Sequence, residues 1–334
     1  MKVRAALFLF MCLATSAVAL IVIYRWPPRL DLERDIVRNQ PISAVAQDIE
    51  TSLATSEKAF EDIRPNQHKQ VIWADRTSPR RTPYSLVYVH GFSASSGEVR
   101  PLPDQLAAAL GVNLYLTRLA GHGRSSTAMG EASIEAWAKD VIEAIEIGEA
   151  IGDQVILLSA STGSSLVTWA LARPTLAQNV AATIFISPNY GVQAPGSFLL
   201  TGPFAEPLAR LLIGDNRGFE PLNERVAANW TTSYPVKALI PMAQAVRLAA
   251  HTRVEDITVP ALFLQSSEDK VIRPDLTASV SKRWGGPSML VDPGPNGDPN
   301  SHVIAGDAFS PETTAAVRQT ILDWLAGNGI QPIR

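Results

Sequence analysis

The chain has 334 residues, of which 46% are hydrophobic, and its 29 basic and 32 acidic residues give a net charge of −3. This composition can form a large buried core, and without a long basic run it argues against a nucleic-acid partner. The single cysteine, Cys12, lies in the apolar N-terminal stretch, so this sequence can form neither a disulfide framework nor a cysteine-based metal site.

Residues 1–29 predict a membrane signal. After a basic start, the nineteen residues from Ala5 to Ile23 carry no charge, and Pro27 and Pro28 end the helix. A helix of that length is about 28 Å long, close to the thickness of the bilayer hydrocarbon. We expect an uncleaved signal anchor that holds the catalytic domain outside the cytoplasm, in the periplasm if the source is bacterial. The alternative is a secretory signal cleaved at Ala17-Val18-Ala19, which would yield a secreted protein.

Residues 30–70 predict a leader with one amphipathic helix near Ile42 to Phe60, and strand and helix signals alternate over residues 71–334. Such alternation is typical of a mostly parallel sheet with helices on both faces, the α/β class. The expected strands are Val71–Trp73, Ser85–Val89, Val112–Leu116, Val155–Leu158, Ala182–Ile186, Ala261–Leu264 and Ser288–Val291. The expected helices are Leu102–Leu110, Ala132–Ile151, Leu166–Ala172 and a last one that Ser310 caps and that runs to about Ala326.

One stretch, about residues 190–256, interrupts the alternation. It contains Phe198, Phe204, Phe219, Trp230 and Tyr234, and a helical segment near 238–250. We interpret it as an inserted, mostly helical lid. The alternative is a set of ordinary core helices joined by long loops.

A serine lies in a tight strand-to-helix turn, Ser159-Ala160-Ser161-Thr162-Gly163. This pattern is typical of a nucleophile elbow, in which small flanking residues let the backbone turn sharply and expose the serine hydroxyl. Ser159 replaces the first of the two usual glycines, and Gly163 keeps the second. The alternative is a serine-rich loop without chemistry.

A serine nucleophile needs a base, and histidine is the usual one near neutral pH. Of the five histidines, His302 is best placed, between the last strand and the last helix. His68 precedes the sheet, His251 ends a helix of the insertion, and His90 and His122 are expected to brace loops.

A carboxylate must orient the imidazole, and Asp269 follows a strand directly. Glu268 beside it is the alternative. His90-Gly91-Phe92 also follows a strand, and its glycine lets a backbone N–H point toward the serine. We expect the N–H groups of Phe92 and Thr162 to form an oxyanion hole, in which each donor contributes about 3 kcal/mol.

Together these residues resemble the lid-bearing lipases and esterases of the α/β-hydrolase family, such as monoacylglycerol lipases, lysophospholipases and carboxylesterases. The order Ser161, Asp269, His302 is the order of that family. The likeness covers roughly Ile72 to Ala326. It rests on His90-Gly91-Phe92, Gly121-His122-Gly123-Arg124-Ser125, the Ser161 turn, Ser267-Glu268-Asp269-Lys270-Val271 and Ser301-His302-Val303.

The resemblance implies transfer of an acyl group to water through an acyl-enzyme on Ser161, with no metal and no organic cofactor. The partners it implies are a small-molecule or lipid ester and, through the N-terminal helix, a membrane. The aromatic insertion suggests an apolar acyl chain. Two alternatives are another chemistry on the same fold, such as hydrolysis of a carbon–carbon bond or perhydrolysis, and a membrane-tethered binding module without catalysis.

Overall fold

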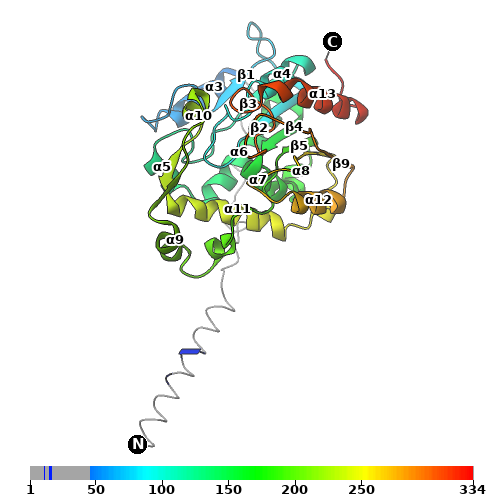
Figure 1. The fold of residues 1–334 in the computed structure, drawn as a ribbon. Coiled ribbons are helices and arrows are strands. Elements are labelled where there is room, and N and C mark those ends of the chain that lie inside the picture. The colour runs from blue at the N-terminus through cyan, green and yellow to red at the C-terminus, as the bar shows by residue number, and fades with distance from the viewer. Residues whose placement is uncertain (1–10, 12–14, 17–45, 334) are drawn as a thin grey trace, which may run out of the picture.

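The computed structural model describes residues 11, 15–16 and 46–333 (Figure 1). Nearly all of the predicted membrane anchor and most of the leader, including the start of its predicted helix, lie outside these residues. Within the described ranges, no helix is both long and apolar enough to cross a bilayer.

A seven-stranded sheet in the order β1-β3-β2-β4-β5-β8-β9 forms the centre of the domain. β1 runs antiparallel to β3 at one edge, and every other neighbouring pair is parallel. The predicted α/β fold class is therefore confirmed. The strands are Gln70–Ile72 (β1), Thr82–Val89 (β2), Asn113–Leu116 (β3), Gly152–Ala160 (β4), Val180–Ile186 (β5), Ala261–Leu264 (β8) and Ser288–Val291 (β9).

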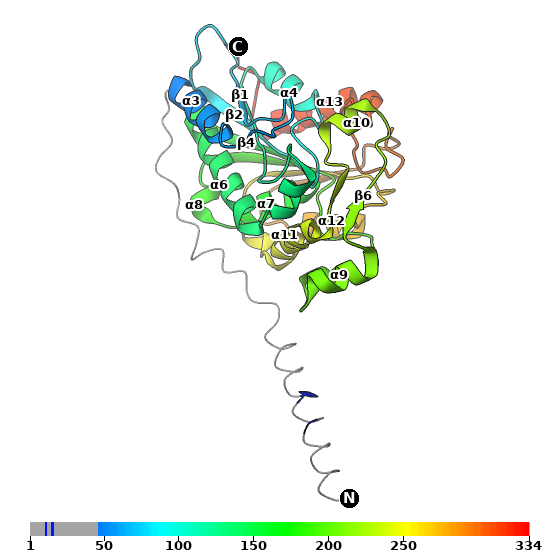
Figure 2. The same ribbon diagram turned by 90° about the vertical axis from the view of Figure 1, so that its left-hand side faces the viewer.

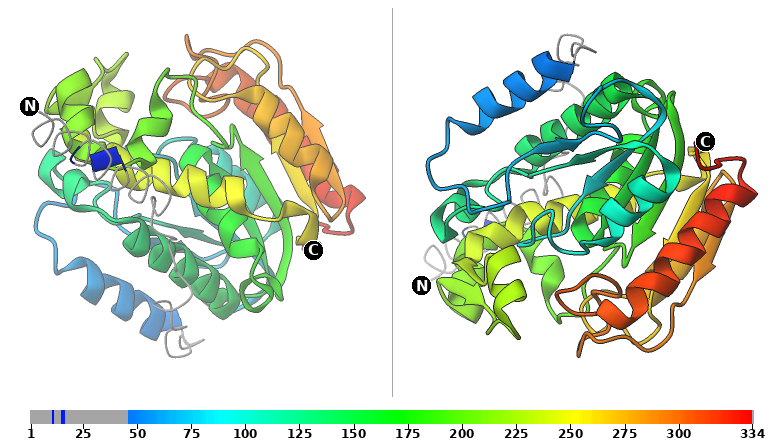
Figure 3. Two further views of the ribbon diagram at one scale, coloured as in Figure 1. Left: turned by 90° about the horizontal axis from the view of Figure 1, so that it is seen from below. Right: turned by 90° about the horizontal axis from the view of Figure 1, so that it is seen from above.

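Helices cover both faces of this sheet (Figure 3). The alternating side chains of β2 show why: Val87 and Val89 are buried in one apolar cluster, and Leu86 and Tyr88 are buried in the other. The first cluster joins α3 (Ala46–Glu57), α6 (Ile134–Ile151), α7 (Ser161–Leu171), α11 (Leu239–His251) and α12 (Pro274–Arg283), and the second joins α4 (Leu102–Leu110) and α13 (Pro311–Gly327). The short helices α5 (Ser126–Glu131) and α8 (Pro174–Ala177) complete the domain.

The insertion lies between β5 and β8, where the sequence predicts it. It is less uniformly helical than predicted, because β6 and β7 pair as a small antiparallel sheet. Its elements are η1 (Ser197–Thr201), α9 (Ala205–Ile213), β6 (Asn216–Gly218), α10 (Glu224–Asn229), β7 (Ser233–Pro235), η2 (Val236–Ala238), α11 and η3 (Val254–Asp256). α9 projects away from the sheet (Figure 2).

The helices of the insertion differ in how deeply they are buried. α11 behaves as a core helix, since Ala245 and Ala249 are buried in the cluster that contains α7. α9 does not, because Ala209 is its only buried residue and Leu211 is 80% exposed. The segment from η1 to β6 therefore forms the outer part of the insertion, whereas Val226 of α10 and the following Trp230 are buried in the second apolar cluster.

A buried ion pair fastens α3 to the domain. The Arg118 guanidinium donates to both carboxylate oxygens of Glu57, at 2.9 and 2.6 Å, and both side chains are almost fully buried. Burial alone would raise the pKa of Glu57, but Arg118 and the backbone N–H of Lys69 lower it below its ordinary value. The pair thus carries its charges inside the protein.

We expect Glu57→Ala to lower the free energy of unfolding by about 3 kcal/mol, because it leaves the Arg118 charge buried without its partner. Urea denaturation measures this loss. Glu255→Ala is the matched control, since the Glu255–Arg283 pair is about half exposed and its loss should cost less than about 1 kcal/mol. Equal losses in the two variants would contradict a structural role for the buried pair.

Candidate active site

The serine turn has the geometry of a nucleophile elbow. β4 ends at Ala160 and α7 begins at Ser161, whose φ of +47° lies in the left-handed region that non-glycine residues rarely adopt. A Cβ on Gly163 would lie 2.5 Å from the carbonyl oxygen of His90, so glycine is required there. Ser159 is accommodated because its hydroxyl donates to Ser164 Oγ at 3.0 Å. The strained turn holds Ser161 at the carboxyl end of the sheet.

The structure brings Ser161, His302 and Asp269 together. His302 Nε2 lies 3.0 Å from Ser161 Oγ, and His302 Nδ1 lies 2.7 Å from Asp269 Oδ2. The other carboxylate oxygen of Asp269 accepts the backbone N–H groups of Val271 and Ile272, at 2.8 and 3.0 Å. Glu268, the alternative acid, is exposed and makes no contact with the imidazole.

The surroundings of His302 favour its protonated form. Burial alone would lower the pKa of the imidazole, but the charge and hydrogen bond of Asp269 and the charges of Glu98 and Asp298 raise it above the ordinary value. Asp298 also fixes the loop, because its Oδ2 accepts the backbone N–H groups of His302 and Val303. Asp269 thus holds the imidazole ring of His302, and Asp298 holds its backbone.

The two histidines predicted to brace loops do so. His90 Nε2 accepts the N–H of Leu119 at 3.1 Å, and His122 Nε2 accepts the N–H of Ser93 at 3.1 Å. Burial lowers the pKa of His90 to about 4 and the pKa of His122 well below its ordinary value, so both rings are neutral. They connect the loop after β3 to the loop after β2, which carries Phe92.

The predicted oxyanion donors have free N–H groups. Thr162 lies in the first turn of α7, where backbone N–H groups have no partner within the helix. The N–H of Phe92 has no hydrogen-bond acceptor among the described residues. The neighbouring N–H of Gly91 is unavailable, since it donates to Glu98 Oε2 at 2.6 Å. The sequence reasoning missed Glu98, because no local pattern marks a carboxylate seven residues after the glycine that it contacts.

A pocket of about 1080 Å³ opens above Ser161. Apolar side chains of η1, α9 and α11 line one part of it. Polar side chains reach it from the loops after β2, β5, β8 and β9 and from Arg217 and Glu220 of the insertion. Among the predicted aromatic residues of the insertion, Phe219, Trp230 and Tyr234 line it, whereas Phe198 and Phe204 are exposed. No cluster of side chains in the described part of the chain has the composition of a metal site.

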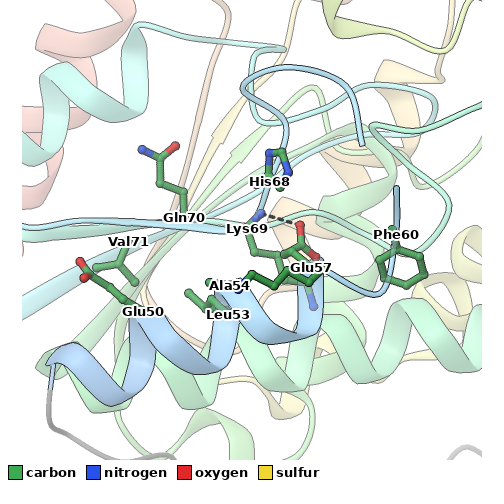
Figure 4. A pocket seen from close by; sticks show the side chains of 10 residues that line it. Glu50, Leu53, Ala54, Glu57, Phe60, His68, Lys69, Gln70 and Val71 are labelled. Atoms are coloured by element: carbon green, nitrogen blue, oxygen red, sulfur yellow. Dashed lines mark hydrogen bonds between the residues drawn. The ribbon is translucent and has the colours of Figure 1, made fainter. Parts of the chain in front are cut away.

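The remaining histidines lie elsewhere. His251 is exposed at the end of α11. His68 lines a separate pocket of about 650 Å³ between α3 and β1 (Figure 4). There Glu57 accepts the backbone N–H of Lys69 at 3.0 Å, and the Lys69 ammonium contacts Asp140 and Glu143. This pocket contains no residue of the predicted site.

The fold and the Ser161–His302–Asp269 arrangement define an α/β-hydrolase. The family model described as "Serine aminopeptidase, S33" matches residues 82–289. The chain belongs to this family and is an enzyme of the lipase and esterase type, a carboxylic ester hydrolase, as the sequence predicts.

Several characterised proteins are similar to the chain. A thermostable monoacylglycerol lipase of Bacillus sp. (strain H-257) is 29% identical over 196 residues, which cover 58% of this chain and 73% of that protein. A metagenome-derived lipolytic enzyme of the LipS and LipT study has a TM-score of 0.64 at 20% identity, over 79% of this chain and 99% of its own. The monoglyceride lipase of Saccharomyces cerevisiae has a TM-score of 0.60 at 11% identity, over 78% and 91%. The two structures support the fold.

We expect the kcat/KM of ester hydrolysis to rise with pH through a midpoint above about 6.5, the ordinary pKa of histidine. Below that midpoint His302 is protonated and cannot accept the Ser161 proton. Asp269→Asn should lower kcat by about 10⁴ and move the midpoint to lower pH, because it removes the strongest influence that raises the His302 pKa. A pH–rate profile measures both effects.

Glu268→Gln is the matched control, because it removes the adjacent exposed carboxylate. Its profile should coincide with that of the wild type. A shifted profile in Glu268→Gln together with an unchanged one in Asp269→Asn would mean that the wrong acid has been assigned.

Proposed function

We propose that the protein hydrolyses carboxylic esters of apolar acyl chains, such as acylglycerols or lysophospholipids, through an acyl-enzyme on Ser161. The observation that carries this proposal is the continuous chain of contacts from Ser161 Oγ through His302 to Asp269, at 3.0 and 2.7 Å. In that arrangement one imidazole nitrogen takes the serine proton while the other is held by a carboxylate.

In the acylation step, Ser161 Oγ attacks the ester carbonyl carbon and its proton passes to His302 Nε2. The negative charge that develops on the carbonyl oxygen is stabilised by the N–H groups of Phe92 and Thr162. When the tetrahedral intermediate collapses, the bond to the alcohol oxygen breaks and His302 gives its proton to that oxygen. The alcohol leaves, and the acyl group stays on Ser161.

In the deacylation step, His302 Nε2 takes a proton from water, and the resulting hydroxide attacks the acyl carbon. The second tetrahedral intermediate collapses, the bond to Ser161 Oγ breaks, and the proton returns to the serine. The carboxylic acid leaves. Asp269 keeps its charge throughout and stabilises each imidazolium.

An apolar acyl chain is supported by the walls of the pocket. Leu199, Leu200, Leu239 and Met242 line it on the side of the insertion. α9 also presents Leu211 and its neighbours to solvent, an apolar surface next to the pocket that suits a lipid substrate. The monoacylglycerol lipases among the similar proteins support the same substrate class. In this proposal the outer part of the insertion is the lid of the pocket.

We expect the wild type to hydrolyse 4-nitrophenyl octanoate with a kcat/KM at least about tenfold above that for the acetate. Burial of each additional methylene contributes about 0.8 kcal/mol, and six more are available for burial. Spectrophotometric release of nitrophenol measures the series. Ser161→Ala should lose about 10⁶ in kcat and all labelling by a fluorophosphonate probe.

Ser165→Ala is the control, because its hydroxyl donates to the backbone oxygen of Asn189 and lies outside the pocket. It should keep its labelling. A preference for acetate would contradict the lipid substrate class. Labelling without turnover of any ester would favour another chemistry on this fold, and absence of labelling in the wild type would favour a binding module.

We also propose that residues 5–23 anchor the protein in a membrane with the catalytic domain outside the cytoplasm. The support is the uncharged run itself, which is long enough to span the hydrocarbon and is followed by two prolines. An anchored enzyme would stay close to lipid esters.

The full-length protein should sediment with membranes and resist extraction by carbonate, while added protease degrades its domain in spheroplasts. Ala14→Arg at the centre of the run should reduce retention, since arginine there costs about 3 kcal/mol, and Ala14→Leu should not. Recovery of a shortened, freely secreted chain would instead establish cleavage at Ala17-Val18-Ala19.

A further inference from the structure

Two residues of the loop after β2 are nearly buried, and each turns a side-chain oxygen without a protein partner toward the pocket. Ser93 and Glu98 are 5% and 4% exposed, and both line the pocket above Ser161. Within the described part of the chain, no group forms a hydrogen bond with Ser93 Oγ or Glu98 Oε1. The catalytic steps above use neither atom.

The rest of each residue is firmly held. Glu98 Oε2 accepts the N–H of Gly91 at 2.6 Å and the hydroxyl of Tyr88 at 3.0 Å. The backbone of Ser93 donates to His122 and accepts from the N–H of Thr231. The free oxygen of Glu98 therefore belongs to a fixed side chain and Ser93 Oγ to a residue with a fixed backbone, so binding a ligand there costs little ordering.

Glu98 lies beside the nucleophile, on the side of His302. A Cβ on Gly91 would be 2.7 Å from Glu98 Oε1 and 3.0 Å from Ser161 Cβ, so one small volume separates the two residues. A Cβ on Gly306, four residues after His302, would be 3.1 Å from the carbonyl oxygen of Glu98. The loop therefore packs against the segment that carries the base.

The reaction chemistry places the alcohol part of the ester on the side of the pocket where Glu98 and His302 lie. His302 must protonate the leaving oxygen, so the alcohol of the ester lies toward His302, and the acyl chain lies toward the apolar wall of η1 and α11. This assignment rests on the proposed function. The polar end of the pocket then faces the alcohol.

We propose that Ser93 and Glu98 form a subsite that binds hydroxyl groups of the alcohol part of the ester. Glu98 Oε1 accepts a hydrogen bond from one hydroxyl, and Ser93 Oγ donates to or accepts from a second. An alcohol without hydroxyls covers both oxygens, displaces the water that would otherwise bind them and leaves them unpaired. A site of this kind discriminates strongly against analogues that lack the donor. The subsite therefore selects esters of polyols over esters of simple alkyl alcohols.

The test compares two esters with the same acyl group, glycerol 1-octanoate and propyl octanoate. We expect the wild type to favour the glycerol ester by at least about tenfold in kcat/KM. Glu98→Gln keeps the shape of the side chain and an acceptor for Gly91 and Tyr88, but it removes the charge. Glu98→Gln should reduce the preference for the glycerol ester by about fivefold, because a charged acceptor binds a hydroxyl donor more strongly than a neutral group does. Ser93→Ala should reduce the preference by a similar factor. For Glu98→Gln the readout is the ratio of the two esters, because loss of the Glu98 charge also lowers the pKa of His302 and so affects both esters alike.

Two controls change the same residue types elsewhere in the pocket. Ser197→Ala and Glu220→Gln both lie on the side of the insertion, and the ratio of the two esters should stay at the wild-type value. Thermal unfolding of each variant checks that the fold is kept. Because Ser93→Ala and Glu98→Gln alter different contacts, instability of one leaves the other as a test.

A proportional loss on both esters in Glu98→Gln would overturn the subsite, since Glu98 would then act only as a brace for the oxyanion loop. A wild-type preference for an aminopropyl ester over the glycerol ester would also overturn it, in favour of recognition of a cation. Failure of the proposed function has a different outcome: neither ester is hydrolysed and the wild type is not labelled by a fluorophosphonate.

Discussion

The close approach of β4, α7 and the loop after β2 around Ser161 is the constraint on which the rest of the site depends. β4 must end and α7 must begin at one residue with a φ of +47°, and this is possible only where the neighbouring strands leave room. Gly163 and Gly91 provide that room, because a Cβ on either would collide with the loop after β2 or with its contacts. The cost of the strain is offset by the buried parallel sheet beneath it.

The histidines around the site differ in the direction in which their surroundings shift the imidazole pKa. His90 and His122 are buried without a carboxylate partner, so they are neutral and accept backbone N–H groups as fixed struts. His302 is buried among carboxylates and keeps its affinity for a proton. One residue type thus serves as scaffold and as base within one site, and the presence of Asp269 at 2.7 Å decides which.

The sequence predicts those parts of the structure that local patterns determine. β8 and β9 begin and end where predicted, since short apolar runs between turn residues mark buried strands. The association of Ser161, Asp269 and His302 follows from their common position at carboxyl ends of parallel strands. The pairing of β6 with β7 is not predicted, because it depends on contacts across the fold. α12 is missed as well, although Pro274 at its start and Lys282 and Arg283 in its last turn are local signals of a helix. Ser93 and Glu98 are not predicted as pocket residues either. They line the pocket because of the way their loop packs, and a loop has no periodic sequence pattern from which this could be predicted.

The pocket consequently has two ends of different origin. Its catalytic floor and polar end are built by loops that the sheet holds rigidly, through Glu98 on Gly91 and Asp298 on His302. Its apolar end is built by η1, α9 and α11 of the insertion, and of these three only α11 contributes buried residues to the core clusters. Recognition of the alcohol would therefore be fixed by the scaffold, and accommodation of the acyl chain would depend on η1 and α9, which few buried contacts hold in place. Such a division lets acyl-chain preference change through the insertion while the geometry around Ser161 stays constant.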